Sequence, residues 1–181
     1  KENWEKTGRW NGLEVLFKLS GSNNKEYALG ATHEEVVTPL AQKFVFSYKD
    51  LPKAVYQIQT KFRDEPRAKS GVLRGREFRM KDLYSFHAST VELDEYYEKM
   101  QETYFRVYER CGIREMTYLT LASGGTFSKY SHEYQTVTAA GEDIIFVCPH
   151  CDIAVNREIA AEVGNKCPQC QAADLREEKA I

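Results

Sequence analysis

The sequence predicts an α+β fold, an antiparallel β-sheet with flanking helices, followed by a small module that contains four cysteines. Short stretches with strand character are joined by turn residues, and two longer segments repeat apolar residues at helical spacing. The strands do not alternate regularly with helices, which disfavours a doubly wound parallel sheet. We expect the sheet and helices to occupy residues 1–143 and the cysteine module to occupy residues 144–181.

The bulk composition is that of a globular chain. Its 181 residues suffice for one ordinary domain, or for one domain with a small satellite, and 42% of them are hydrophobic. The longest apolar runs, such as 144–147, are far shorter than the roughly 20 residues of a membrane span. Residues 1–10 have no apolar signal-peptide centre. We therefore expect a cytoplasmic protein without a membrane span, and the missing initiator Met suggests a chain that starts within a longer protein.

The first expected elements are a short hairpin and a helix. Residues 13–19 and 27–29 are strand candidates on either side of a polar turn at 20–24. Thr32 and Glu35 have the spacing of a capping box, which predicts a helix start. An apolar stripe at helical spacing follows them: Val36, Val37, Leu40, Ala41 and Phe44.

A longer hairpin is expected in the middle of the chain. After a loop at 49–52, residues 55–63 have strand character, and a second strand is expected over 76–86. A polar loop containing Pro66 and Gly71 separates the two.

The second helix has the clearest signals of the chain. Ser89 and Glu92 have capping-box spacing, and Gly112 stands where a C-terminal cap belongs. The lone Cys111 beside that cap is expected to be buried. An apolar and aromatic stripe between the caps is expected to face the core: Leu93, Tyr96, Tyr97, Met100, Tyr104, Val107 and Tyr108.

The C-terminal part is expected to begin with two strands and to end with a metal site. Residues 117–121 and 133–138 are strand candidates around a glycine loop at 124–125. Two cysteine pairs that enclose 15 residues follow, a spacing typical of a two-knuckle zinc site: Cys148, Cys151, Cys167 and Cys170. Four thiolates close a tetrahedron, so a structural Zn²⁺ in a zinc-ribbon-like module is expected, and free thiols are the alternative. His150 could replace a cysteine, although the paired spacing makes this unnecessary.

The charge of the chain is balanced overall but uneven locally. Its net charge is −2, which neither indicates nor excludes a nucleic-acid partner. Eight basic and three acidic residues lie between 61 and 81. A solvated charged hairpin or a site for a large anion would each explain this basic segment.

The residues in this basic segment suit a nucleotide. Arg63 and Glu65 are two apart on one expected strand, so both can point to one face, and Arg74, Phe78 and Asp82 recur every four residues. A guanidinium binds phosphate or carboxylate oxygens, and an aromatic ring stacks on a base with about 1–3 kcal/mol. A carboxylate can accept a hydrogen bond from an exocyclic amine. Ion pairs on the sheet and a core phenylalanine are the plainer alternatives.

These segments resemble a known family. Residues 62–65 together with 74–82 look like motif 2 of class II aminoacyl-tRNA synthetases, and the wider run 56–87 resembles the bacterial-type prolyl enzymes of that family. Residues 29–35 resemble the amino-acid-binding loop of the same family, with Ala31 where a proline is usual.

The resemblance extends over nearly the whole chain, the cysteine segment being the least similar part. Residues 123–125 and 131–134 resemble a third stretch of the same catalytic domain. Motif 1 would precede Lys1, and motif 3 and an anticodon-binding domain would follow Ile181. The resemblance thus implies a catalytic-domain fragment that is inactive alone, from a protein that forms a homodimer, and no editing activity within this chain.

The resemblance also implies a reaction and a set of roles. It implies an aminoacyl-tRNA ligase that uses ATP with Mg²⁺ to activate proline and then transfers it to tRNA(Pro). Arg63 would be catalytic at the α-phosphate and the substrate carboxylate. The implied ATP contacts are Arg63, Glu65 at the adenine amino group, Phe78 on the adenine ring and Arg74 at the γ-phosphate. The implied proline contacts are Thr32, Glu34, Arg63, Asp82, Tyr84, His87 and His132.

Other interpretations remain open at this point. Thr32 could serve only as a helix cap, and Glu34 is not needed for such a cap. His33 is expected to be structural or exposed. Threonyl, seryl or glycyl specificity would fit the same family, and a synthetase-like binding or regulatory protein without catalysis would fit the same fold. The cysteine module could be a brace or a tRNA-side accessory.

Overall fold

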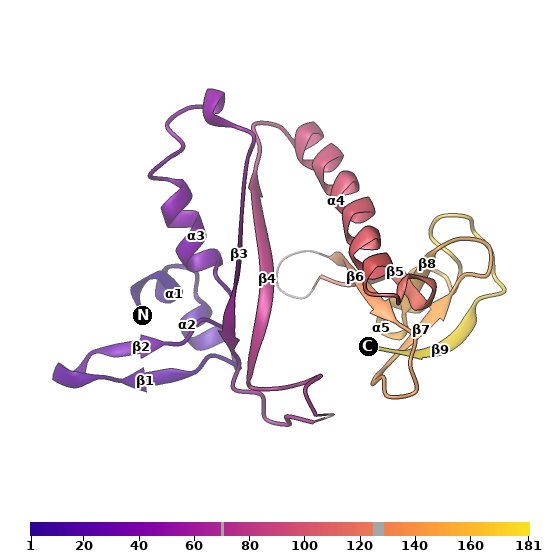
Figure 1. Cartoon of the computed structure of the whole chain (residues 1–181), viewed down its shortest axis with the longest axis horizontal. Coiled ribbons are helices and arrows are strands. Elements are labelled where there is room, and N and C mark those ends of the chain that lie inside the picture. Colours follow the sequence, from indigo (N-terminus) through magenta and orange to yellow (C-terminus); the bar gives the residue numbers. More distant parts are fainter. Residues whose placement is uncertain (70, 125–128) are drawn as a thin grey trace. The chain divides into compact units, whose positions relative to one another are not determined.

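The computed structural model describes residues 1–69, 71–124 and 129–181, and Figure 1 shows their helices and strands. The chain divides into two compact units, Lys1–Tyr97 and Glu98–Ile181. No helix among the described residues has the length and apolar character needed to cross a membrane.

The first unit begins with two short helices and a hairpin. Helices α1 (Glu2–Lys6) and α2 (Arg9–Gly12) precede strand β1 (Lys18–Ser20), the 3₁₀ turn η1 (Ser22–Asn24) and strand β2 (Glu26–Ala28), which pairs antiparallel with β1. A small core joins these helices to the segment before α3, and its buried members are Trp4, Trp10, Leu16 and Ala31.

The strand predicted over residues 13–19 is wrong for most of its length, because β1 begins only at Lys18. Leu16 is 5% exposed and packs with the two tryptophans instead of pairing in a sheet. The apolar run therefore lines a core from a loop, a use that the spacing of apolar residues alone does not distinguish from a strand.

Helix α3 (Glu34–Ala41) forms, but the predicted capping box does not. Thr32 donates its hydroxyl hydrogen bond to Glu34, and the N-cap residue His33 makes no side-chain cap bond. Glu35 is buried and accepts hydrogen bonds from Arg9 at 2.9 Å and Thr7 at 3.1 Å. These long-range partners replace the local cap, and of the predicted stripe only Val37 is buried.

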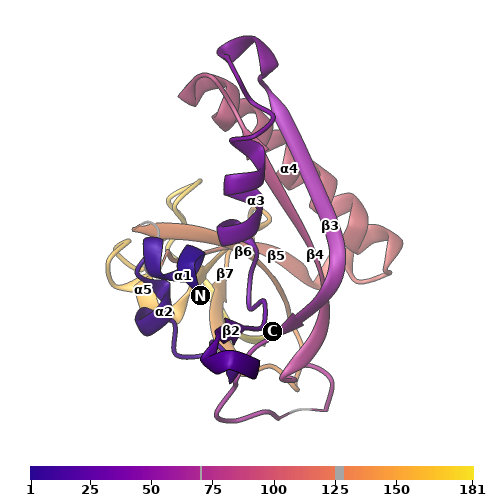
Figure 2. The same cartoon turned by 90° about the vertical axis from the view of Figure 1, so that its left-hand side faces the viewer.

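The long hairpin is confirmed. After the 3₁₀ turn η2 (Tyr48–Asp50), strand β3 (Lys53–Phe62) pairs antiparallel with β4 (Glu77–Phe86) along all ten residues of each. The two strands run side by side in both views, Figure 1 and Figure 2. Gln57 lies opposite Asp82, and Lys61 lies opposite Phe78. Because side chains alternate along a strand, one face of the hairpin carries these four residues together.

Helix α4 (Thr90–Arg110) has the predicted caps. Ser89 Oγ accepts from the Glu92 N–H at 3.3 Å, and the Glu92 carboxylate accepts from the Ala88 N–H at 3.1 Å. At the other end Gly112 has φ 74°, and the next N–H, of Ile113, donates to the Tyr108 carbonyl at 3.0 Å.

The prediction that the stripe of α4 faces a core is wrong, because no residue of this fully described helix is buried. In its C-terminal half Tyr104, Phe105 and Tyr108 surround Tyr134 with ring centroids 5.3–5.4 Å apart, and in its N-terminal half Tyr96 contacts His87. Cys111, at the end of this helix, is exposed, also against expectation. Helical spacing predicts which side chains share a face but not whether anything covers that face.

The second unit is built on one five-stranded sheet. After the 3₁₀ turn η3 (Arg114–Met116), its strand order is β6-β5-β8-β7-β9, with β5 and β8 parallel and the other pairs antiparallel. The elements are β5 (Thr117–Ser123), β6 (Tyr130–Thr136), β7 (Asp143–Val147), β8 (Ile153–Asn156), α5 (Arg157–Ala160) and β9 (Arg176–Ala180). Gly125 of the predicted glycine loop lies outside the described residues. The predicted antiparallel sheets with helices are confirmed.

The two edges of this sheet meet. Thr136 and Ile181 exchange backbone hydrogen bonds of 2.8 and 3.1 Å, and the Thr138 N–H donates to the Lys179 carbonyl at 3.0 Å. Inside lies a core of Ile145, Val147, Ala154 and Ala180, and a second cluster with Val155 and α5 lies on the other face. Strands β7, β8 and β9 thus share a sheet with β5 and β6. The expected domain boundary at residue 143 stays a prediction.

Candidate functional site

Three hydrogen bonds fasten the loop before α3 to the β3–β4 hairpin. The Phe62 N–H donates to the Gly30 carbonyl at 2.9 Å, Arg63 Nε donates to the Ala31 carbonyl at 3.2 Å, and the His33 N–H donates to Tyr84 Oη at 3.2 Å. Most of the residues predicted for ATP and for proline are thereby brought to one place in the first unit.

The predicted nucleotide residues gather at the end of the hairpin where a loop connects β3 to β4. The Arg63 guanidinium lies over the Phe78 ring, 5.3 Å from its centroid. Arg74 Nε lies 3.5 Å from Glu65 Oε2, and the Glu65 carbonyl accepts from Arg76 Nε at 2.9 Å. An aromatic face, guanidinium groups and a carboxylate therefore lie within one short stretch, as recognition of a base and a phosphate chain requires.

The loop before α3 presents one available carboxylate. Glu34 accepts the Thr32 hydroxyl hydrogen bond, lies 3.4 Å from Arg9 Nη1, and keeps its side chain 45% exposed. Its neighbour Glu35 has a fully buried side chain paired with Arg9 at 2.9 Å. The two adjacent glutamates therefore differ, because Glu35 is used within the fold while Glu34 can still meet an ammonium group.

Asp82 is the centre of a hydrogen-bond network on the same face. Its carboxylate accepts from Lys61 Nζ at 2.8 Å, Gln57 Nε2 at 2.7 Å and Tyr84 Oη at 2.6 Å. Burial alone would raise the pKa of Asp82, but these three donors outweigh it and lower the pKa below its ordinary value. Burial and the adjacent Asp82 raise the pKa of Tyr84, so its hydroxyl stays protonated.

The sequence interpretation missed the roles of Lys61, Gln57 and Arg9. Lys61 counted only as a member of the basic segment, yet its side chain is fully buried. The alternation of 57, 59, 61 and 63 along one strand was a usable signal, because it places all four on the face of Arg63. Arg9 gave no comparable signal, since its partner lies 26 residues away.

The two predicted histidines, His87 and His132, belong to different units. His87 follows the end of β4, with its ring centroid 5.2 Å from that of Tyr96, and its two buried ring nitrogens have no hydrogen-bond partner among the described residues. His132 lies on β6 of the second unit, where it lines a cavity of about 220 Å³ with apolar residues such as Leu121 and Ile153. Their proposed contact with proline stays a prediction.

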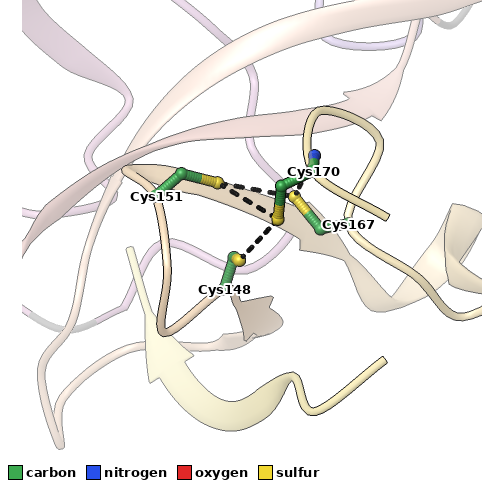
Figure 3. Close-up of side chains that lie close together, drawn as sticks. All are labelled: Cys148, Cys151, Cys167 and Cys170. Carbon is green, nitrogen blue, oxygen red and sulfur yellow. Dashed lines mark hydrogen bonds between the residues drawn. The ribbon is translucent and has the colours of Figure 1, made fainter. Parts of the chain in front are cut away.

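The four cysteines converge in the second unit (Figure 3). All four sulfurs lie within 4.8 Å of one another, and the shortest separations are 3.4 Å between Cys148 and Cys170 and 3.5 Å between Cys151 and Cys167. A tetrahedral Zn²⁺ with Zn–S bonds of about 2.3 Å would separate its sulfurs by roughly 3.8 Å. The donor set and spacing therefore fit such an ion.

Backbone N–H groups of the two turns donate to two of the four sulfurs. The His150 N–H donates to Cys148 Sγ at 3.4 Å, and the Cys170 N–H donates to Cys167 Sγ at 3.5 Å. Although burial raises the pKa of Cys167, backbone donors lower it to about 7. His150 does not join the cluster, because its Nε2 lies 3.0–3.1 Å from the carboxylate oxygens of Asp174.

Comparison with known proteins assigns the chain to a family. The family described as "tRNA synthetase class II core domain (G, H, P, S and T)" matches residues 17–170. The chain belongs to this family. The residues that resemble motif 2 of the class II synthetases form the β3–β4 hairpin and its connecting loop.

Three curated relatives of this class II synthetase chain are named proline–tRNA ligase. Proteins named proline–tRNA ligase are similar to it in Dehalococcoides mccartyi strain 195 (46% identity over 177 residues, 97% of this chain and 31% of the relative) and in Bacillus subtilis strain 168 (47% over 169 residues, 92% and 30%). A third, in Shouchella clausii, is 43% identical over 180 residues, 99% of this chain and 32% of the relative. The chain spans about a third of the length of these relatives.

Proposed function

We propose that this class II synthetase chain forms part of an enzyme that activates proline with ATP and transfers the prolyl group to tRNA(Pro). The observation that carries the proposal is the attachment of residues 31–33 to the hairpin, through the bond from Arg63 to the Ala31 carbonyl and the bond from the His33 N–H to Tyr84. It joins a site suited to an amino acid with a site suited to a nucleotide. The shared name of the curated relatives supports proline as the amino acid.

The reaction needs positioning more than acid–base chemistry. A carboxylate oxygen of proline attacks the α-phosphorus of ATP, a new P–O bond forms, and the bond to pyrophosphate breaks. The carboxylate is already ionised at neutral pH, so no general base is required. In this proposal Arg63 lies between the two reactants, neutralises charge at the α-phosphate and orients the carboxylate.

The remaining residues divide between the two substrates. Phe78 offers the ring on which adenine would stack, Glu65 would accept from its amino group, and Arg74, with a half-exposed side chain, would meet the γ-phosphate end. Mg²⁺ bound with ATP would neutralise further phosphate charge. Thr32 and Glu34 would hold the proline ammonium, because the Glu34 carboxylate is the accessible acidic group of that loop.

ATP–pyrophosphate exchange with proline tests this proposal. Glu34→Gln in the natural full-length protein should raise the KM for proline by about tenfold or more, since a charge-assisted hydrogen bond contributes about 1.5–3 kcal/mol. Arg63→Ala should abolish exchange. An Arg63→Ala protein that exchanges at the wild-type rate would refute the assignment.

We also propose that the four cysteines hold a structural Zn²⁺ in a zinc-ribbon-like module. Four sulfur ligands leave no open position for substrate, so the ion would brace the fold or a tRNA-side surface. The enzyme would work in the cytoplasm, and its longer form would be a homodimer.

A further inference from the structure

Asp82 has little capacity left for a ligand. Three side chains donate to its carboxylate, and one of them, Lys61, carries a full charge with no exposed side-chain surface. An ionised carboxylate has about four acceptor sites, and three are filled from within the hairpin. Asp82 was predicted to lie at the proline pocket, but its bonds direct it toward its neighbours.

The network leads from Asp82 to the amino-acid loop through one hydroxyl. Because Asp82 is ionised and accepts only, the Tyr84 hydroxyl must point its proton at Asp82. The Tyr84 oxygen then turns a lone pair outward, and the His33 N–H donates to it at 3.2 Å. His33 is the N-cap residue of α3, so its N–H has no partner within the helix.

His33 stands between Thr32 and Glu34. Holding its N–H therefore restrains the backbone on both sides, from which the Thr32 and Glu34 side chains extend. The loop is also held by the bonds from Phe62 and Arg63 to Gly30 and Ala31, and Arg9 contacts the carboxylates of Glu34 and Glu35. Among these attachments, the Tyr84 contact is the one made to the backbone between Thr32 and Glu34.

We propose that Lys61 is a positioning residue for the amino acid, acting through Asp82 and Tyr84 to hold the Thr32–Glu34 loop. This inference rests on the proposed function. Lys61 is suited to the task because a buried carboxylate without its cationic partner is costly and takes up a proton more readily. A protonated Asp82 would no longer fix the direction of the Tyr84 hydroxyl.

Two variants of the natural full-length protein test the proposal, with two readouts. Tyr84→Phe removes only the hydroxyl, and Lys61→Met removes the charge while keeping most of the side-chain length. Each should speed hydrogen exchange of the His33 amide and raise the KM for proline by up to roughly tenfold, the value of one hydrogen bond. The KM for ATP should change less than twofold. Lys43→Met, at an exposed lysine of the same unit, is the matched control and should change neither.

The outcomes separate this inference from the proposed function. If the hydrogen exchange of the His33 amide is unchanged in both variants, the inference is overturned whatever the enzymatic activity. An equal rise in the KM for proline and the KM for ATP would also overturn it, because that result indicates general destabilisation. Should Lys61→Met fail to fold, Tyr84→Phe decides alone. A wild-type protein without proline-dependent ATP–pyrophosphate exchange would refute the proposed function, and with it the role of Lys61 in amino-acid binding. This holds even if the hydrogen exchange of the His33 amide responds as expected.

Discussion

Removal of the ion pair between Lys61 and Asp82 should destabilise the first unit. The Lys61 side chain is fully buried, that of Asp82 is 12% exposed, and the two charged atoms are 2.8 Å apart. Removing one partner of a buried pair typically costs about 3–5 kcal/mol, because the other charge stays buried without compensation. Gln57 and Tyr84 also donate to Asp82 and reduce this loss of stability. We therefore expect Lys61→Met to lower the free energy of unfolding by about 3 kcal/mol.

Tryptophan fluorescence during urea unfolding measures this change in the correct part of the chain. The chain contains two tryptophans, Trp4 and Trp10, and both lie buried in the first unit with Lys61. At a slope of about 1.5 kcal/mol per molar urea, the midpoint should fall by roughly 2 M. Adding Asp82→Asn to Lys61→Met removes the unpaired charge, and the double variant should recover to within about 1 kcal/mol of wild type.

A loss below about 1 kcal/mol in Lys61→Met would refute this reasoning, and so would a double variant as unstable as the sum of its single changes. Acid should act in the same direction. The pKa of Asp82 is lowered in the folded state, so its contribution is complete above the unfolded pKa of about 3.9 and is lost as the pH falls through the folded value. The stability advantage of wild type over Asp82→Asn should therefore shrink below about pH 4.

Three further changes have defined outcomes. Glu35→Gln should lower the free energy of unfolding by about 2 kcal/mol in the same fluorescence assay, since it weakens a buried charge-assisted hydrogen bond. Glu34→Gln should lower it by under about 0.5 kcal/mol. Equal effects would contradict the distinction between the two glutamates. Gly141→Ala should destabilise the second unit by about 1–3 kcal/mol, because its added Cβ would lie 2.3 Å from a carbonyl oxygen of β9. The control is Gly12→Ala, whose added Cβ meets no atom within 4 Å. Circular dichroism at rising urea concentration compares the two variants. Cys148→Ser should lower the zinc content of the purified protein from one ion per chain to well under half, as measured by atomic emission, and a wild-type protein without zinc would rule out the metal site.

Sequence patterns predicted the elements whose signals are local. The β3–β4 hairpin and the caps of α4 follow from alternation and from capping residues a few positions apart. The Thr32–Glu35 cap failed because Glu35 binds Arg9, a partner far away in sequence. The stripe of α4 failed for a related reason, since periodicity does not reveal whether another layer covers a helix.

The candidate site divides in the same way. Residue type and spacing predicted that Arg63, Glu65, Arg74 and Phe78 bind a nucleotide, which stays a prediction, and the paired spacing of the four cysteines predicted that they come together. Lys61 was missed because a lysine in a basic segment is ordinarily solvated, and only the fold shows that it is buried. Which residues act through others, rather than on a ligand, depends on hydrogen-bond directions that no spacing specifies.

Amino-acid-dependent ATP–pyrophosphate exchange by the natural full-length protein, with each of the twenty amino acids in turn, tests the central claim most directly. We expect exchange with proline well above that with any other amino acid, and its loss in Arg63→Ala. No exchange with any amino acid from a folded protein would contradict the account and favour a synthetase-like binding protein, and exchange with threonine, serine or glycine in place of proline would contradict the assigned substrate.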